Sequence, residues 1–283
     1  MRITYFKVNN FLTYKKMILN FSETNINFLA SEIQKLKKEN ETLIIGISGG
    51  SASGKTSLVT PKLKEILEKD FEVSILNMDN FQMGKEFVEN LKSLYKYDDK
   101  RNFCLEEVNE ILWKLKNGEN VEIPKFSLEK VVRDGKIFFK NAEIILLEGI
   151  YATDEILQKN LDFSIFVEDE VTNMLTKRIL RYALEMKLKN GPVGALKQYL
   201  KYVLPAYNDL VLEQKQKANV IIKIDFDFHF LIEKYDLESK EINIENEKIL
   251  FSMKNENLEL IGTDKKFFIN FKGKNYFSFE IND

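Results

Sequence analysis

A glycine-rich segment carries the first chemical signal in this chain. Residues 46–57 read Gly-Ile-Ser-Gly-Gly-Ser-Ala-Ser-Gly-Lys-Thr-Ser and contain the pattern Gly-x-x-x-x-Gly-Lys-Thr. Small residues let successive backbone N–H groups point into one concavity, which suits a polyphosphate when a helix follows. We expect Lys55 to meet the β- and γ-phosphates and Thr56 to hold Mg²⁺. The predicted nucleotide-binding residues are Gly49, Gly50, Ser51, Ala52, Ser53, Gly54, Lys55, Thr56 and Ser57.

Two carboxylates follow apolar runs further along the chain, and they narrow the chemistry. Asp79 comes after the run Val73–Met78, and Glu148 after Ile144–Leu147. In open α/β sheets, ligands bind at the carboxyl ends of the strands. Asp79 is therefore predicted to accept the proton of an attacking hydroxyl, and Glu148 to hold the metal's water shell. The alternative for Asp79 is a cap of a turn or helix.

Composition excludes several classes of site. The formal net charge is −2, which gives no global basic field for nucleic acid or an anionic membrane. One cysteine, Cys104, and one histidine, His229, cannot form a zinc cluster or an internal disulfide. No apolar run approaches the length of a membrane span, and no signal-peptide pattern begins the chain, so we expect a cytoplasmic protein without a membrane partner.

The elements that must position these residues alternate along the middle of the chain. Apolar runs predict five strands, at residues 43–47, 73–78, 144–147, 163–167 and 220–224, and amphipathic segments lie between them. This rhythm predicts an α/β protein in which helices cover both faces of a parallel sheet. Together with the phosphate loop after its first strand, the pattern resembles the P-loop NTPase fold. The predicted domains are a hairpin and helix at 1–40, the α/β domain at 41–225 and a small antiparallel β unit at 226–283.

The flanking segments predict further elements. Residues 3–21 suggest a hairpin and residues 25–40 an amphipathic helix. In the terminal unit, strands are predicted at 228–232, 241–244, 248–253, 258–261, 267–271 and 276–281, and one open alternative is that the N-terminal hairpin completes this unit. Cys104, near the start of the helix 105–115, and Trp113, on that helix, are interpreted as core residues, and His229 as a strand-packing or surface histidine.

Several ordered segments resemble the uridine kinase and phosphoribulokinase family of P-loop kinases over about residues 42–224. The loop 45–56 is similar to that of uridine kinases almost letter for letter. The other matching segments are Met78-Asp-Asn-Phe81, Tyr97-Asp98, Ile123-Pro-Lys-Phe126, Leu147-Glu-Gly-Ile150, Lys177-Arg-Ile-Leu-Arg181, Gln198-Tyr199, Leu204-Pro-Ala-Tyr207 and Ala218-Asn-Val-Ile-Ile222.

The resemblance implies ATP as donor, Mg²⁺ as cofactor and roles for particular residues. Asp79 would be the base, Asp98 and Gln198 would grip sugar hydroxyls of the acceptor, and Arg178 and Arg181 would neutralise the transferring phosphoryl group. Without the family pattern, a solvated helix face is the simpler interpretation of the two arginines. Family members are commonly oligomers, which implies a homo-oligomer here.

Departures from the family pattern concern the acceptor. Phe126 and Val131 stand where uridine kinases place the tyrosine and histidine that contact the base, whereas Arg133 keeps the family residue. Lysine replaces arginine in the lid segment, residues 187–192. The phosphoribulokinase branch has a basic residue near Arg101, so Arg101 and Arg133 could hold an anionic acceptor.

The leading hypothesis is an ATP- and Mg²⁺-dependent kinase that acts on a hydroxyl of a nucleoside or similar small metabolite. A phosphoribulokinase-like sugar-phosphate kinase is the first alternative, and a non-catalytic nucleotide-binding regulatory or scaffold module is the second. A GTPase is disfavoured because the Asn-Lys-x-Asp element for guanine is missing.

Overall fold

The computed structural model describes residues 2–8, 11–181, 195 and 198–224, together with strands between residues 241 and 280. The chain divides into two compact units, residues 1–169 with 201–225 and residues 170–200 with 226–283. The domain boundaries expected from the sequence stay predictions. Among the described residues, no helix has both the length and the apolar character needed to cross a bilayer.

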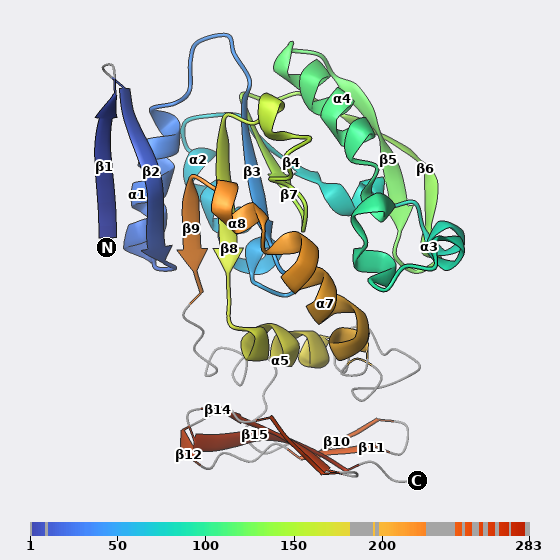
Figure 1. Ribbon diagram of the computed structural model, residues 1–283. Helices are drawn as coiled ribbons and strands as arrows, with labels where there is room; N and C mark the ends of the chain where they lie inside the picture. The colour runs from blue at the N-terminus through green and yellow to red at the C-terminus, as the bar shows by residue number, and fades with distance from the viewer. Residues whose placement is uncertain are drawn as a thin grey trace. The chain divides into compact units, whose positions relative to one another are not determined.

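A seven-stranded sheet organises the first unit (Figure 1). Its strand order is β1-β2-β9-β8-β3-β7-β4, and every neighbouring pair except β1 with β2 is parallel. The strands are β1 (Arg2–Val8), β2 (Phe11–Asn20), β3 (Leu43–Gly49), β4 (Val73–Asn77), β7 (Ile144–Glu148), β8 (Phe163–Glu168) and β9 (Val220–Lys223). The five predicted strands and the hairpin are confirmed.

The helices of this unit flank the sheet and complete its core. In Figure 1, α1 and α2 lie behind the sheet, and α7 and α8 lie in front of it. The described helices of the unit are α1 (Glu23–Gln34), α2 (Thr60–Leu67), α3 (Lys85–Leu91), α4 (Leu105–Lys116), α7 (Leu204–Ala206) and α8 (Gln214–Lys217). Strands β3 and β7 are buried along their whole length, as expected for central strands covered on both faces.

The N-terminal hairpin belongs to the main sheet. Met17 to Asn20 pair in register with Val220 to Lys223, so β9, orange in Figure 1, lies between blue β2 and yellow-green β8. The alternative that this hairpin completes the C-terminal unit is therefore wrong. Helix α1 begins earlier than predicted because Ser22 caps it, its hydroxyl accepting the Asn25 N–H at 3.2 Å. It ends at Gln34 rather than Asn40.

A two-stranded ribbon, β5 (Val121–Ser127) with β6 (Val132–Phe139), was not predicted. Helix α4 packs beside it, and two predictions of core positions fail here. Trp113 is 56% exposed, because it lies about 100° around the helix from buried Leu112. Cys104 is half-buried, with φ of 31°, where a core position was predicted.

The second unit contains α5 (Val171–Arg181) and a mainly antiparallel sheet. Its strands are β10 (Glu241–Ile244), β11 (Glu247–Leu250), β12 (Asn255–Glu256), β13 (Leu260–Thr263), β14 (Lys266–Phe271) and β15 (Gly273–Glu280). Five of the six predicted strands are confirmed with shifts at their ends. The strand predicted at 228–232, His229 and the lid segment 187–192 lie outside the described residues.

Close packing around Gly46 in β3 gives a stability prediction. A Cβ at this position would lie 2.6 Å from the carbonyl oxygen of Ala152 and 2.9 Å from a methyl of Leu161. We expect Gly46→Ala to lower the free energy of unfolding by about 1–3 kcal/mol, because backbone must move. Urea denaturation measures the change. The control is Gly118→Ala. Its Cβ would meet nothing within 4 Å, so this change carries only the backbone strain of a φ of +83° and no steric clash. A loss no larger than that of the control would contradict the packing argument.

Candidate functional site

The glycine-rich loop joins the buried strand β3 to a helical segment that begins at Lys55 with a π-helical turn, Lys55–Val59. Gly49 has φ of +148°, and a Cβ there would lie 2.4 Å from the carbonyl oxygen of Val167 in β8. Gly54 also has a positive φ, +99°, and it precedes the helical turn directly. Glycine is therefore required at both ends of the loop. The loop therefore runs from a buried strand into a helical turn, which is the setting that a phosphate cradle needs, and phosphate binding by residues 49–57 stays a prediction.

Lys55 lies within this loop. It is buried, and its Nζ donates to the carbonyl oxygen of Gly50 at 3.2 Å. An ammonium group folded back over the loop is placed to interact with a polyphosphate that occupies the cradle. Ser53 is also buried, and its hydroxyl has no hydrogen-bond partner among the described residues.

Glu148 is brought to the same place by sheet register. It ends β7, where its backbone pairs with Ile47 of β3 on one side and Asn77 of β4 on the other. Burial raises the pKa of Glu148, against the opposing charge of Lys55 and smaller contributions from the hydroxyls of Thr60 and Thr56. The Asn77 amide donates to Oε1 at 3.3 Å, but buried Oε2 has no hydrogen-bond partner within 3.5 Å among the described residues.

This unpartnered oxygen is the observation that tests a magnesium site. A buried carboxylate oxygen without a donor is costly unless a cation or an ordered water meets it. Thr56 supplies a hydroxyl near the Glu148 carboxyl group, and Mg²⁺ is usually held by one or two protein oxygens together with phosphate oxygens and waters. The residues present therefore fit the cation that the sequence implies.

The raised pKa of Glu148 predicts a pH dependence. Mg²⁺ binds the ionised form of the Glu148 carboxyl group. The affinity of the protein for the magnesium-nucleotide complex should therefore fall as the pH drops through the raised pKa of Glu148. Glu148→Gln should weaken binding of the magnesium-nucleotide complex at neutral pH and flatten that dependence. Titration calorimetry over a pH series measures both effects, with Glu143→Gln as a control carboxamide at the residue just before the same strand. A pH dependence that survives in Glu148→Gln would exclude Glu148 as its source.

Asp79 lies one strand away, at the carboxyl end of β4. It belongs to the 3₁₀ turn Met78–Phe81, and its N–H donates to the Asn77 side chain at 2.8 Å. Its Oδ1 accepts from the Gln82 amide at 3.2 Å, while the residue remains exposed. The turn packs closely on the residue after Glu148, because a Cβ at Gly149 would lie 2.5 Å from that of Met78. The exposed carboxylate can therefore meet a hydroxyl near the loop.

The next predicted site residues, Asp98 and Arg101, lie in two consecutive 3₁₀ turns. Asp98 ends the 3₁₀ turn Lys96–Asp98, and its carbonyl oxygen accepts the Tyr151 hydroxyl at 2.5 Å. Arg101 forms a two-pronged pair with buried Asp99, with Nε–Oδ1 at 2.9 Å and Nη2–Oδ2 at 2.7 Å. Burial acts to raise the pKa of Asp99, but hydrogen bonds from Arg101 and Ser93 outweigh it and hold the pKa at about 2.

Arg133 and Phe126 come from the β5–β6 ribbon. The Arg133 guanidinium donates to the carbonyl oxygens of Phe81 at 2.8 Å and Gln82 at 3.0 Å, and its Nη1 pairs with Glu107 at 2.8 Å. These contacts fasten the Asp79 turn to the ribbon. Phe126 is half-buried, and its N–H donates to the Asn80 side chain at 3.4 Å. Contact of either residue with an acceptor stays a prediction.

The remaining predicted residues belong to the second unit. Arg178 is buried on α5, and its Nη2 donates to Oε1 of Gln198 at 3.5 Å. Arg181 ends the same helix and is exposed. The structure thus brings Arg178 and Gln198 together, and the action of all three residues on a phosphoryl group or an acceptor stays a prediction.

Two asparagines of the site were missed. Asn77 joins Asp79 to Glu148, and its position just before the acidic turn was the available signal. Asn102 is fully buried; its amide donates to the carbonyl oxygen of Tyr97 at 3.0 Å and to the Gln82 side chain at 3.3 Å. Asn102 therefore links the segment around Asp98 to the Asp79 turn. No pattern in the neighbouring sequence predicts this role of Asn102.

Comparisons with known proteins agree with this geometry. Residues 44–226 match the model of the Phosphoribulokinase / Uridine kinase family. The chain is 33% identical to uridine-cytidine kinase B of Dictyostelium discoideum over 63% of this chain and 73% of that protein. It is 32% identical to a uridine kinase of Macrococcus caseolyticus, covering 64% of this chain and 88% of the relative.

Solved structures share the fold. A putative fructose transport system kinase from Silicibacter superposes with a TM-score of 0.60 at 18% identity, over 69% of this chain and 98% of the other. A possible uridine kinase from Bacillus stearothermophilus gives 0.52, also at 18% identity, over 70% and 97%. With the phosphate loop, the two strand-end carboxylates and the family match in place, the chain belongs to the phosphoribulokinase and uridine kinase family and is a kinase that acts on a hydroxyl group.

Proposed function

We propose that this protein transfers the γ-phosphate of ATP, with Mg²⁺, to a hydroxyl of a nucleoside. The observation that carries the proposal is the unpartnered Oε2 of buried Glu148, which lies beside Lys55 and Thr56 and one strand from exposed Asp79. The proposal assigns phosphate binding to the loop, cation binding to Glu148 and proton acceptance to Asp79, and all three follow the carboxyl ends of strands in one sheet. Similarity to proteins named uridine kinases supports a nucleoside as the acceptor.

In this proposal, residues 49–57 hold the phosphates with their backbone N–H groups, and Lys55 neutralises the β- and γ-phosphates. Thr56 and Glu148 would hold Mg²⁺, which supplies positive charge to the phosphate oxygens. Asp79 accepts the proton of the attacking hydroxyl of the acceptor. The oxygen of that hydroxyl bonds to the γ-phosphorus, and the bond from the γ-phosphorus to the bridging oxygen breaks, which releases ADP.

Asp98 would bind the acceptor, because a carboxylate accepts hydrogen bonds from the vicinal hydroxyls of a ribose. The family pattern suggests the same role for the amide of Gln198, a residue of the second unit. Arg178 and Arg181 would neutralise the phosphoryl group in flight. These assignments are proposals of role, made on family pattern and residue chemistry. Homo-oligomerisation and a cytoplasmic location likewise remain expectations.

A phosphorylated sugar is the less favoured acceptor. The two arginines that could hold its phosphate are already engaged, Arg101 by Asp99 and Arg133 by Glu107 and two carbonyl oxygens. Binding an anion there would require those contacts to be replaced. A non-catalytic module is disfavoured because a site without activity has no physical need to retain Lys55, Asp79 and Glu148 together.

The test is production of ADP with MgATP against a panel of ribonucleosides, deoxynucleosides and sugar phosphates. We expect turnover that depends on a ribonucleoside and on Mg²⁺. Turnover with sugar phosphates alone would replace the acceptor. Silence across the panel, with MgATP binding shown by calorimetry, would overturn the proposed activity.

A further inference from the structure

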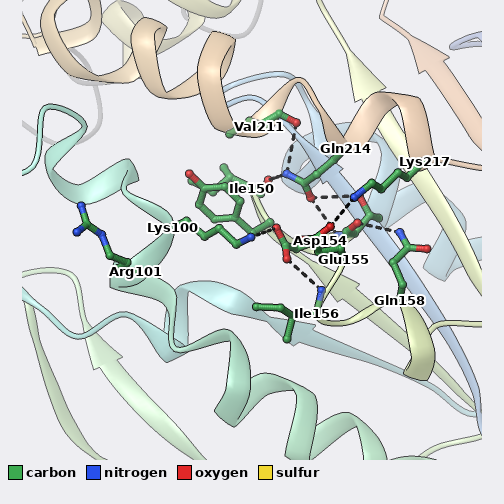
Figure 2. Close-up of polar contacts among 12 residues, drawn as sticks. Lys100, Arg101, Ile150, Asp154, Glu155, Ile156, Gln158, Val211, Gln214 and Lys217 are labelled. Atoms are coloured by element: carbon green, nitrogen blue, oxygen red, sulfur yellow. Dashed lines mark hydrogen bonds and ion pairs between the residues drawn. The ribbon is translucent and has the colours of Figure 1, made fainter.

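The segment that follows Glu148 and Gly149 is buried although it is rich in polar groups. Thr153 and Asp154 are 0% and 1% exposed, and Gln214 of α8, which meets them, is 1% exposed. Buried polar side chains are costly unless each finds a partner. Figure 2 shows Lys100, Asp154 and Gln214 among the members of this network. Its partners lie on two sides.

On one side the segment contacts residues 98–103, which begin with Asp98. Lys100 Nζ lies 2.8 Å from Oδ2 of Asp154, and Oδ1 of the same carboxylate accepts the Ile156 N–H at 3.1 Å. The Tyr151 hydroxyl donates to the carbonyl oxygen of Asp98 at 2.5 Å. The Tyr151 ring also meets Phe103 edge to face, with centroids 5.3 Å apart. Asp98 and two residues that follow it, Lys100 and Phe103, therefore contact the segment after β7.

On the other side the segment contacts the strand that leads into the phosphate loop. The Thr153 hydroxyl lies 2.6 Å from that of Ser48, the residue before Gly49. Oε1 of Gln214 accepts both the N–H and the hydroxyl of Thr153 at 3.2 Å, and its amide donates to the carbonyl oxygen of Ile150 at 2.7 Å (Figure 2). The segment is thus fixed to β3 and to α8.

We propose that residues 150–154, the brace, set the position of Asp98 relative to the phosphate loop, with Tyr151, Lys100 and Asp154 as positioning residues for the acceptor. This inference rests on the proposed function, in which Asp98 grips the acceptor. The brace follows Glu148 and Gly149 directly, so the same stretch of backbone carries both Glu148, the proposed metal ligand, and the contacts that hold Asp98. A misplacement of about 1 Å at a reacting group can cost about 100-fold in rate.

The charge of the pair strengthens the argument. The Asp154 carboxylate is buried, while Lys100 is partly exposed. Removing one partner of a buried pair leaves an uncompensated charge, so the loop that carries Lys100 must move or water must enter. The hydrogen bond from Tyr151 is neutral and acts on Asp98 directly. Its loss tests positioning with little disturbance of charge or volume.

The experiment compares Tyr151→Phe, Lys100→Met and Lys100→Arg with the wild type. The matched control is Lys217→Met, which breaks an exposed ion pair of 2.9 Å with Glu155, the residue after the brace. The measured quantities are kcat/KM for the nucleoside, the Kd for MgATP and the midpoint of thermal unfolding. All are measured on the full chain.

We expect Tyr151→Phe and Lys100→Met to lower kcat/KM for the nucleoside about tenfold or more, while the Kd for MgATP changes less than about twofold. Lys100→Arg should restore most of the loss, and Lys217→Met should match the wild type. Equal losses in acceptor efficiency and MgATP affinity, or no loss in Tyr151→Phe, would overturn the role of the brace. If Lys100→Met does not fold, Tyr151→Phe decides alone. A wild type inactive on every nucleoside would instead reject the proposed function.

Discussion

Replacing Asp79 by asparagine should lower kcat by about two to four orders of magnitude while MgATP still binds. The amide keeps the shape of the side chain and can still meet the Gln82 side chain, which now donates to Oδ1 at 3.2 Å. It cannot take the proton of the attacking hydroxyl. The loss should therefore fall on the chemical step, and single-turnover phosphoryl transfer measures it directly.

A matched control for this variant is Asp134→Asn, an exposed carboxylate on β6 that pairs with Lys130 at 3.0 Å. It should leave kcat unchanged, since surface pairs contribute little. If Asp79→Asn transfers phosphate to the accepted nucleoside at the wild-type rate, Asp79 is not the base, and a capping role in the turn after β4 would be its remaining function.

The second large effect is expected for Lys55→Met, which should reduce kcat about 100- to 1,000-fold and weaken MgATP binding. The methionine preserves much of the buried stem but removes the ammonium that lies over the loop. Lys55 is also the largest influence opposing the raised pKa of Glu148, so that pKa should rise further in the variant.

Two measurements separate these contributions. Calorimetry of MgATP binding reports the loss of phosphate contacts, and the pH profile of binding should shift to higher pH as Glu148 becomes easier to protonate. Lys62→Met, on the first turn of α2 and paired with Glu65 at 2.9 Å, is the control. An unchanged pH profile in Lys55→Met would show that the lysine does not govern the charge of Glu148.

The sequence predicts the central sheet well because its strands are short, mostly apolar runs that alternate with amphipathic segments. The run Ile144–Leu147 is fully buried between β3 and β4, so no other element type fits it. The phosphate loop is predictable for a related reason: its glycines are required by contacts that any such loop makes, such as that of Gly49 with Val167.

The β5–β6 ribbon shows where this reasoning ends. Strand β6 is largely exposed, with Ile137 and Phe138 on its surface, and an exposed strand need not show an apolar pattern. Trp113 illustrates the converse, since residue type suggested the core whereas its angle around α4 places it in solvent. Pairings such as Arg101 with Asp99, or Ser48 with Thr153, depend on turns and on sheet register, which local sequence does not specify.

Parallel pairing of β2 with β9 has a consequence for the order of folding. Residues 17–20 pair with residues 220–223, which lie about 200 positions further along the chain. Contacts between such distant residues are formed late, because the entropy of closing a long loop must be overcome first. During synthesis the hairpin has no neighbour in the sheet until β9 has emerged, although β3, β7 and β8 can already pair. The final step in assembling this sheet is therefore the arrival of a four-residue strand, and an edge of β8 stays open to wrong partners until then.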